Sequence, residues 1–359
     1  MADPQQYKVL CSLGYGSEHI VYKAELNLNS QLYAIKLEKC PGVGQLKNEI
    51  EMLQKLSGVE GIPQIKQFGQ TLENRYFLIV PLYHSNLLDL AKSRKLSLTQ
   101  ILSIGLRIIE IIEKVHKKKI LHLDIKPENI MLSQQCLNDQ DILQPGFIQL
   151  IDFGLSQQFN KDSESLKDVF IGSLNFASRS SHNGTPLGYK DDLESLLYVL
   201  FYIRDLRLPW SEKRFWGFKE VDFKLVGQTK SSFFKSNDFQ SQSLLNFEPF
   251  MSYINQLTYD IMPDYDYIKS LFTQMISKSY TMQSIFKHDK QQTFSNSYYV
   301  DSIIISSDTI QMQIDNIPKS NNHQDIQDDI FHDSTSTLIS KIIGKYNTHQ
   351  IKSIKDIQY

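Results

Sequence analysis

Apolar and polar residues alternate in short runs over the first part of the chain. Between residues 7 and 37 this period of two predicts antiparallel strands, joined by a glycine-containing turn at residues 13–17. In the last of these runs, alternation puts Ala34 and Lys36 on one face and their apolar neighbours on the other. Apolar residues are then spaced by three and four over residues 45–56, which predicts one amphipathic helix.

The pattern becomes mainly helical after residue 83. Before it, a continuously apolar strand at 76–80 runs into Pro81, so the next segment is a candidate hinge. Residues 99–118 predict a helix that is buried on most sides, and two short strands are expected at 130–132 and 147–151. Residues 191–202 predict a central core helix, because two acids suit its N-terminus and the rest is apolar.

These elements predict an α+β protein with two lobes. Residues 1–82 form a small antiparallel β lobe with one helix, and residues 83–289 form a larger, mainly helical lobe. Residues 290–359 are rich in Ser, Asn, Gln, Asp and Thr, which is typical of a disordered tail. Within that tail, residues 336–346 have the spacing of a short amphipathic helix.

Composition excludes several classes of protein. A net charge of -2 and a pI near 6.5 argue against a nucleic-acid binder. The 3 cysteines are widely spaced, so neither a disulfide framework nor a zinc site is expected. No secretion signal or membrane span is evident. We therefore expect an intracellular protein, cytoplasmic or nuclear, and a monomer.

Candidate chemistry is concentrated on the loop from residue 122 to 129. It carries a carboxylate at Asp124, an ammonium at Lys126 and a carboxamide at Asn129. Phosphoryl transfer to a hydroxyl uses such a set as proton acceptor, phosphate contact and metal ligand. Asp152 follows the second short strand, where a carboxylate is costly to bury unless it is paired or binds a cation such as Mg²⁺. Taken singly, each feature also has an ordinary structural explanation.

Together, in their order along the chain, these features match the protein-kinase signature set. Further segments resemble the casein kinase 1 family: Val59-Glu60-Gly61-Ile62-Pro63, Leu87-Leu88-Asp89-Leu90, Gly172-Ser173-Leu174-Asn175-Phe176-Ala177-Ser178, Asp191-Asp192-Leu193-Glu194-Ser195-Leu196 and Leu208-Pro209-Trp210. The resemblance covers about residues 7–289. It implies a serine/threonine protein kinase that transfers the γ-phosphate of ATP to protein substrates with Mg²⁺.

The resemblance also implies a role for each site residue. Lys36 and Glu49 form an ion pair, Asp124 is the catalytic base, Lys126 contacts the transferred phosphate, and Asn129 and Asp152 hold the metal. The implied ATP-binding residues are Leu13, Gly14, Gly16, Val21, Ala34, Lys36, Val80, Pro81, Tyr83, Met131 and Ile151. The alternatives are plain core packing for the apolar residues, and a pseudokinase scaffold or a small-molecule kinase for the protein. The complete set of polar site residues and the family-specific segments disfavour these two alternative functions.

Three departures qualify the resemblance, and the tail adds a further expectation. His19 replaces the third glycine of the phosphate loop and is expected to weaken ATP binding. Leu123 replaces the usual arginine, which predicts activity independent of activation-loop phosphorylation. Asn175 replaces an arginine, and no lysine after Trp210 obviously restores its partner, which predicts weak preference for phosphate-primed substrates. The tail is a candidate passive linker, targeting element or autoinhibitory segment. Its serines and threonines beside acids at 333–337 favour self-phosphorylation that makes the tail a pseudosubstrate, which resembles the tails of the family.

Overall fold

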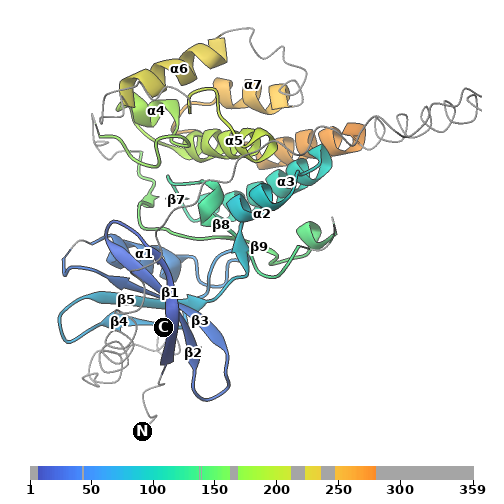
Figure 1. Ribbon diagram of the computed structural model, residues 1–359. Coiled ribbons are helices and arrows are strands. Elements are labelled where there is room, and N and C mark those ends of the chain that lie inside the picture. The colour runs from blue at the N-terminus through green and yellow to red at the C-terminus, as the bar shows by residue number, and fades with distance from the viewer. Residues whose placement is uncertain are drawn as a thin grey trace, which may run out of the picture.

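The computed structural model describes residues 7–42, 44–136, 138, 140–161, 169–211, 223–235 and 247–279. The expectations for the tail, including its disorder, its helix at 336–346 and its contact with the kinase, lie outside these residues. The described chain forms a β-rich lobe and a helical lobe, coloured blue and green-to-orange in Figure 1. This arrangement confirms the predicted fold class.

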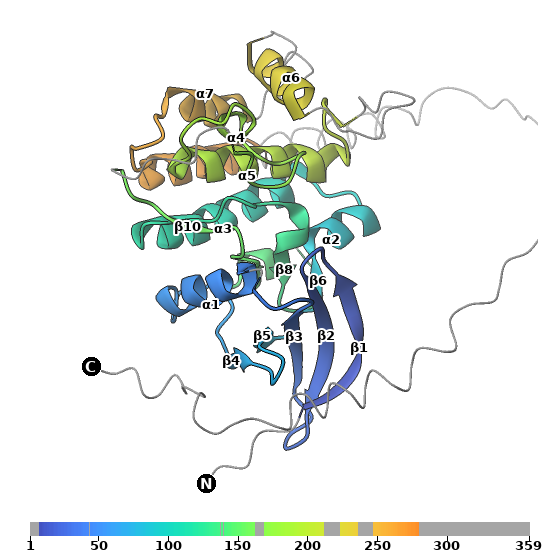
Figure 2. The ribbon, with the colours of Figure 1, turned by 90° about the vertical axis from the view of Figure 1, so that its left-hand side faces the viewer.

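The N-terminal lobe is a five-stranded antiparallel sheet with one helix. The strand order is β1-β2-β3-β5-β4. The helix lies on the side of the sheet nearest the helical lobe in Figures 1 and 2. The elements are β1 (Tyr7–Tyr15), β2 (His19–Leu26), β3 (Leu32–Glu38), α1 (Gln45–Lys55), β4 (Gln67–Gln70) and β5 (Tyr76–Pro81).

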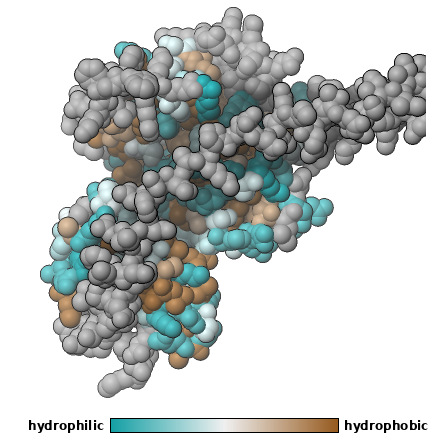
Figure 3. Space-filling view, viewed as in Figure 1, coloured by the Kyte–Doolittle hydropathy of each residue, from teal (hydrophilic) through white to brown (hydrophobic). Residues whose placement is uncertain are grey.

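The two faces of this sheet differ, as the alternation predicted. Tyr33, Ile35 and Leu37 of β3 are buried in a small apolar core, together with side chains of β2 and β5. Ala34 and Lys36 lie on the opposite face and are partly exposed. Figure 3 shows apolar surface on this lobe, and β1 carries exposed leucines. Ala34 and Lys36 therefore lie outside the small apolar core of this lobe.

The C-terminal lobe is built around two buried helices that pack against each other, α3 and α5. A capping box between Ser97 and Gln100 fixes the start of α3. The elements are β6 (Ser85–Asn86), α2 (Leu87–Ser93), α3 (Leu98–Lys117), β7 (Ile120–Leu121), η1 (Pro127–Asn129), β8 (Ile130–Leu132), η2 (Asp141–Leu143), β9 (Ile148–Leu150), β10 (Gln157–Gln158), α4 (Arg179–His182), α5 (Tyr189–Asp205), α6 (Phe223–Lys235), α7 (Glu248–Gln256) and a last helix at 265–279.

One continuous apolar core joins α1 of the first lobe to α3 and α5 of the second. The predicted core helix begins two residues earlier than expected, at Tyr189, and its acids at 191 and 192 lie in its first turn. Among the described residues, no helix is both long enough and apolar enough to cross a membrane. The short strands β8 and β9 lie between the two lobes and carry the loops described next.

Candidate active site

Lys36 is at the centre of a partly buried ion-pair triad. Its Nζ lies 2.7 Å from Glu49 Oε2 of α1 and 2.8 Å from Asp152 Oδ1, which follows β9. Burial would lower the pKa of Lys36, but the two carboxylates outweigh it and hold that pKa above its usual value. Burial likewise opposes ionisation of Asp152, yet Lys36 lowers the pKa of that carboxyl to about 2. Burial raises the pKa of the Glu49 carboxyl, and Lys36 opposes that rise.

Asp124 is held by three polar side chains. Its Oδ2 accepts hydrogen bonds from Lys126 Nζ at 2.6 Å and Asn129 Nδ2 at 3.1 Å. Its Oδ1 accepts one from Ser173 Oγ at 2.7 Å, and Lys126 Nζ also lies 3.0 Å from that hydroxyl. The carboxylate is 7% exposed. Asp124 therefore has one fixed orientation in which it can accept a proton from a substrate hydroxyl.

The loop that carries Asp124 is held from below by Asp192 of α5. The completely buried Asp192 carboxylate accepts hydrogen bonds from the backbone N–H of His122 at 2.7 Å and of Leu123 at 2.8 Å. Its Oδ2 also lies 2.9 Å from Nε2 of His116. Leu123 has a φ of 65°, a left-handed conformation that is unfavourable for leucine. Asp192 therefore stabilises a strained turn directly before Asp124.

Asp152 and Asn129 are brought side by side by their backbones. The N–H of Ile151 donates to the carbonyl of Asn129 at 2.9 Å, next to Asp152. The His122 ring lies against Phe153, with its Nε2 3.0 Å from the carbonyl of Ile151. A carboxylate and a carboxamide oxygen are hard donors of the kind that divalent cations accept beside phosphates. The two residues therefore fit a divalent metal.

The strand register aligns the expected nucleotide-binding residues of the first lobe. Gly14 pairs with Val21, Val21 with Lys36, and Ala34 with Val80. Directly paired residues share a face of a sheet, so these five residues line the same side. The structure thus brings them together in two neighbouring rows.

The other expected nucleotide-binding residues surround those rows at the junction of the lobes. Leu13 lies at a β-bulge of β1 and is 49% exposed. The carbonyl of Gly16 accepts a hydrogen bond from Lys39 Nζ. Pro81 ends β5 and pairs with Tyr33, and the Tyr83 hydroxyl donates to Gln149 at 3.2 Å. Met131 and Ile151 are partly buried beside β8 and β9.

Two of the departures have a clear structural setting. His19 is half-buried at the start of β2, and burial together with Lys36 lowers its pKa to about 4, so the imidazole is neutral at pH 7. Leu123 is 6% exposed in an apolar cluster with Leu121 and Tyr189. Phe159, Ile171 and Leu187 pack against this cluster, so the surroundings of Leu123 are apolar.

A lysine that the sequence did not single out serves the segment 173–177. Lys230 of α6 donates from Nζ to the carbonyls of Leu174 at 2.9 Å and Ala177 at 2.6 Å. A lysine on an amphipathic helix usually lies in solvent, so its sequence position gave no sign of this role. Its side chain is 0% exposed, so the ammonium faces inward rather than toward a substrate.

Ser173 and Asp192 were also not identified as site residues from the sequence. Ser173 was noted as part of a family-like segment, and Asp192 as part of another such segment and as an acid at a helix N-terminus. Their partners are 49 and 69–70 residues away, so no local spacing could have revealed them.

Comparisons with known proteins show which family the chain resembles. The family model described as "Protein kinase domain" matches residues 7–289. The chain is 27% identical over 288 residues to casein kinase I homolog 1 of Schizosaccharomyces pombe, covering 77% of this chain and 62% of that protein. It is 28% identical over 298 residues to a probable casein kinase I homolog of Encephalitozoon cuniculi, covering 80% and 90%. A casein kinase I homolog of Kluyveromyces lactis is 28% identical over 288 residues, covering 76% of this chain and 51% of that relative.

Proposed function

The chain belongs to the protein kinase family and is a divergent casein kinase I-like member, and from this premise we propose that it is an active serine/threonine protein kinase. The proposal rests above all on the contact of Lys36 with both Glu49 and Asp152. Proteins that keep the fold without catalysis commonly lose one of these groups, whereas this chain keeps all three in contact.

In the proposed reaction, the chain's own residues position the reactants and accept a proton. Asp124 orients the substrate hydroxyl and takes its proton as the oxygen attacks the γ-phosphate of ATP. Lys126 lies against Asp124 and is placed to contact the transferred phosphate, while Lys36 binds the more distant phosphates. Asn129 and Asp152 would hold Mg²⁺, which neutralises charge on the phosphates when it is bound.

The proposal includes two regulatory features. The apolar cluster around Leu123 offers no cation to a phosphorylated loop, which supports activity without activation-loop phosphorylation. The inward-facing ammonium of Lys230 and the neutral side chain of Asn175 support a weak preference for phosphate-primed substrates. A strong stimulation by a phosphoserine three residues before the acceptor would contradict the second feature.

The decisive experiment measures transfer of labelled phosphate from ATP to casein by the wild-type protein and by Asp152→Asn. We expect activity in the wild type and a loss of at least ~100-fold in the variant, since one metal-binding charge is removed. Asp89→Asn, an exposed carboxylate on α2, is the matched control and should retain activity. Equal signals from the wild type and Asp152→Asn would refute the enzyme proposal and leave a binding module.

A further inference from the structure

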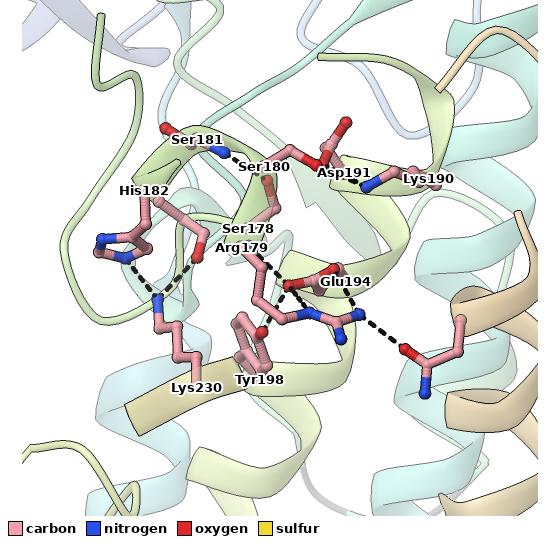
Figure 4. A network of polar contacts seen from close by, with 12 residues as sticks. Ser178, Arg179, Ser180, Ser181, His182, Lys190, Asp191, Glu194, Tyr198 and Lys230 are labelled. Carbon is pink, nitrogen blue, oxygen red and sulfur yellow. Dashed lines mark hydrogen bonds and ion pairs between the residues drawn. The ribbon is translucent and has the colours of Figure 1, made fainter. Parts of the chain in front are cut away.

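Lys230 is a completely buried lysine directly beneath the segment that meets Asp124. Figure 4 shows its amine pointing toward His182 at the end of α4, away from solvent. The Nζ has three acceptors: the carbonyls of Leu174 and Ala177, and His182 Nε2 at 3.0 Å. An ammonium has three donors, so its hydrogen-bonding capacity is used entirely inside the protein.

The acceptors around this amine are backbone carbonyls and an imidazole rather than a carboxylate. Glu194 of α5 is the nearby carboxylate, but it receives Nε and Nη2 of Arg179 at 3.0 and 3.1 Å and the hydroxyl of Tyr198 at 2.5 Å. Within the described residues, no ion pair joins Lys230 to a carboxylate. The Tyr198 and Trp210 rings lie 4.9 and 5.4 Å from its Nζ and supply cation–π stabilisation instead.

Trp210 binds the carbonyl that Lys230 does not reach. Its Nε1–H donates to the carbonyl of Asn175 at 2.9 Å, and its side chain is almost completely buried. The backbone carbonyls of residues 174, 175 and 177 are therefore all held from the interior of the helical lobe. We call Lys230 and Trp210 together the carbonyl clamp.

The other end of the clamped segment reaches the reacting groups. Ser173 directly precedes the first clamped carbonyl, and its hydroxyl contacts both Asp124 and Lys126. Any shift of residues 174–177 would be transmitted through one peptide unit to Ser173. A displacement of about 1 Å at a positioning group can lower a rate by ~100-fold.

We propose that Lys230, acting through the carbonyl clamp, is a positioning residue that sets where a protein substrate meets Asp124. The inference rests on the proposed kinase function and extends it to the protein-substrate side of the site. The clamp touches neither Lys36 nor the strands that line the nucleotide side. Its loss should therefore raise the KM for the protein substrate and leave the KM for ATP unchanged. Because the cation is consumed internally, the substrate meets the neutral carboxamide of Asn175 at this segment.

The test compares Lys230→Met with the wild type and with Lys224→Met, a matched control at an exposed position of the same helix. Michaelis constants are measured separately for an unphosphorylated serine peptide and for ATP at pH 6.5. We expect Lys230→Met to raise the peptide KM at least 10-fold and to leave the ATP KM within twofold. The control should leave both constants within twofold of the wild type.

Trp210→Phe gives an independent measurement if Lys230→Met does not fold. It keeps an aromatic ring and removes only the N–H that binds Asn175. We expect it to raise the peptide KM about threefold to tenfold, because a buried hydrogen bond of ~1 kcal/mol is lost. A folded Lys230→Met or a Trp210→Phe variant with a wild-type peptide KM would overturn the proposal. So would an equal rise in both Michaelis constants.

A pH profile provides a readout that a purely structural role would not give. Burial lowers the pKa of Lys230 to about 7, and Glu194 opposes this shift. The groups that face Lys230 do not titrate between pH 6 and 9. Burial lowers the pKa of His182 to about 4 and raises the pKa of Tyr198. Burial opposes ionisation of Glu194, but Arg179 outweighs it and lowers the pKa of that carboxyl. The peptide KM should therefore rise above pH 7, when the neutral amine can donate only two hydrogen bonds, and this rise should be absent in Lys230→Met.

The two proposals fail in different ways. An inactive wild type refutes both the kinase function and the inference drawn from it. An active wild type whose clamp variants show unchanged peptide constants refutes the carbonyl clamp alone.

Discussion

Replacing Asp192 with asparagine would test how the catalytic loop is held. The carboxylate uses both oxygens: Oδ1 accepts from Leu123 N, and Oδ2 contacts His122 N and His116 Nε2. Asparagine offers one oxygen and one NH2 group. In the better orientation the oxygen keeps the two contacts at Oδ2, and the NH2 group then faces the N–H of Leu123.

The expected cost follows from that contact. A hydrogen bond to a charged group contributes ~1.5–3 kcal/mol, and a buried N–H left without an acceptor costs ~1–3 kcal/mol. The two costs partly describe the same lost hydrogen bond and are not simply added. We therefore expect Asp192→Asn to lower the free energy of unfolding by about 3 kcal/mol. The left-handed Leu123 would also lose its restraint and relax, which moves the adjacent Asp124. A loss of about 100-fold in kcat is expected from such a displacement.

Urea unfolding gives the stability change, and steady-state kinetics with casein gives kcat for the folded fraction. Asp266→Asn is the matched control, because Asp266 is 93% exposed and pairs with Lys269 at the surface. It should change stability by less than ~1 kcal/mol. An Asp192→Asn variant with a stability loss below ~0.5 kcal/mol and a kcat within twofold of the wild type would refute the role assigned to this carboxylate.

Three further predictions concern the same site. Ser173→Ala should lower kcat by roughly 10- to 100-fold, because the charge-assisted hydrogen bond to Asp124 is lost. Ser173→Thr keeps the hydroxyl and should retain most activity. Equal kcat values for the alanine variant and the wild type would contradict this prediction. Phosphatase treatment should change activity less than twofold because Leu123 offers no phosphate partner, and a large loss would show that a phosphorylation switch exists. His19→Gly should lower the KM for ATP. The His19→Gly variant should also lose less free energy of unfolding than the wild type when the pH is lowered from 6.5 to 4, as measured by urea titration. The pKa of His19 is about 4 in the folded protein and near 6.5 in the unfolded chain, so the unfolded chain binds more protons in this range. His19 therefore destabilises the fold as the pH is lowered. An unchanged slope in the variant would contradict that assignment.

Local sequence determined much of the architecture. Alternation in β3 determined which face carries Ala34 and Lys36, because successive side chains of a strand point to opposite sides. The spacing within residues 122–129 likewise predicted that Asp124, Lys126 and Asn129 act together, since a short loop keeps such groups within reach. The structure confirms the two faces of β3 and brings the side chains of Lys126 and Asn129 into contact with Asp124.

Only the tertiary structure decided what Asp192 and Lys230 do. An acid at a helix N-terminus and a lysine on an amphipathic helix both have an ordinary explanation in solvent, and nothing in their neighbours along the chain contradicts it. Asp192 instead meets backbone donors 69–70 residues away, and Lys230 meets carbonyls 53 and 56 residues away. Helical and strand periodicity describes which face is apolar, but which buried polar groups satisfy one another depends on how distant segments pack.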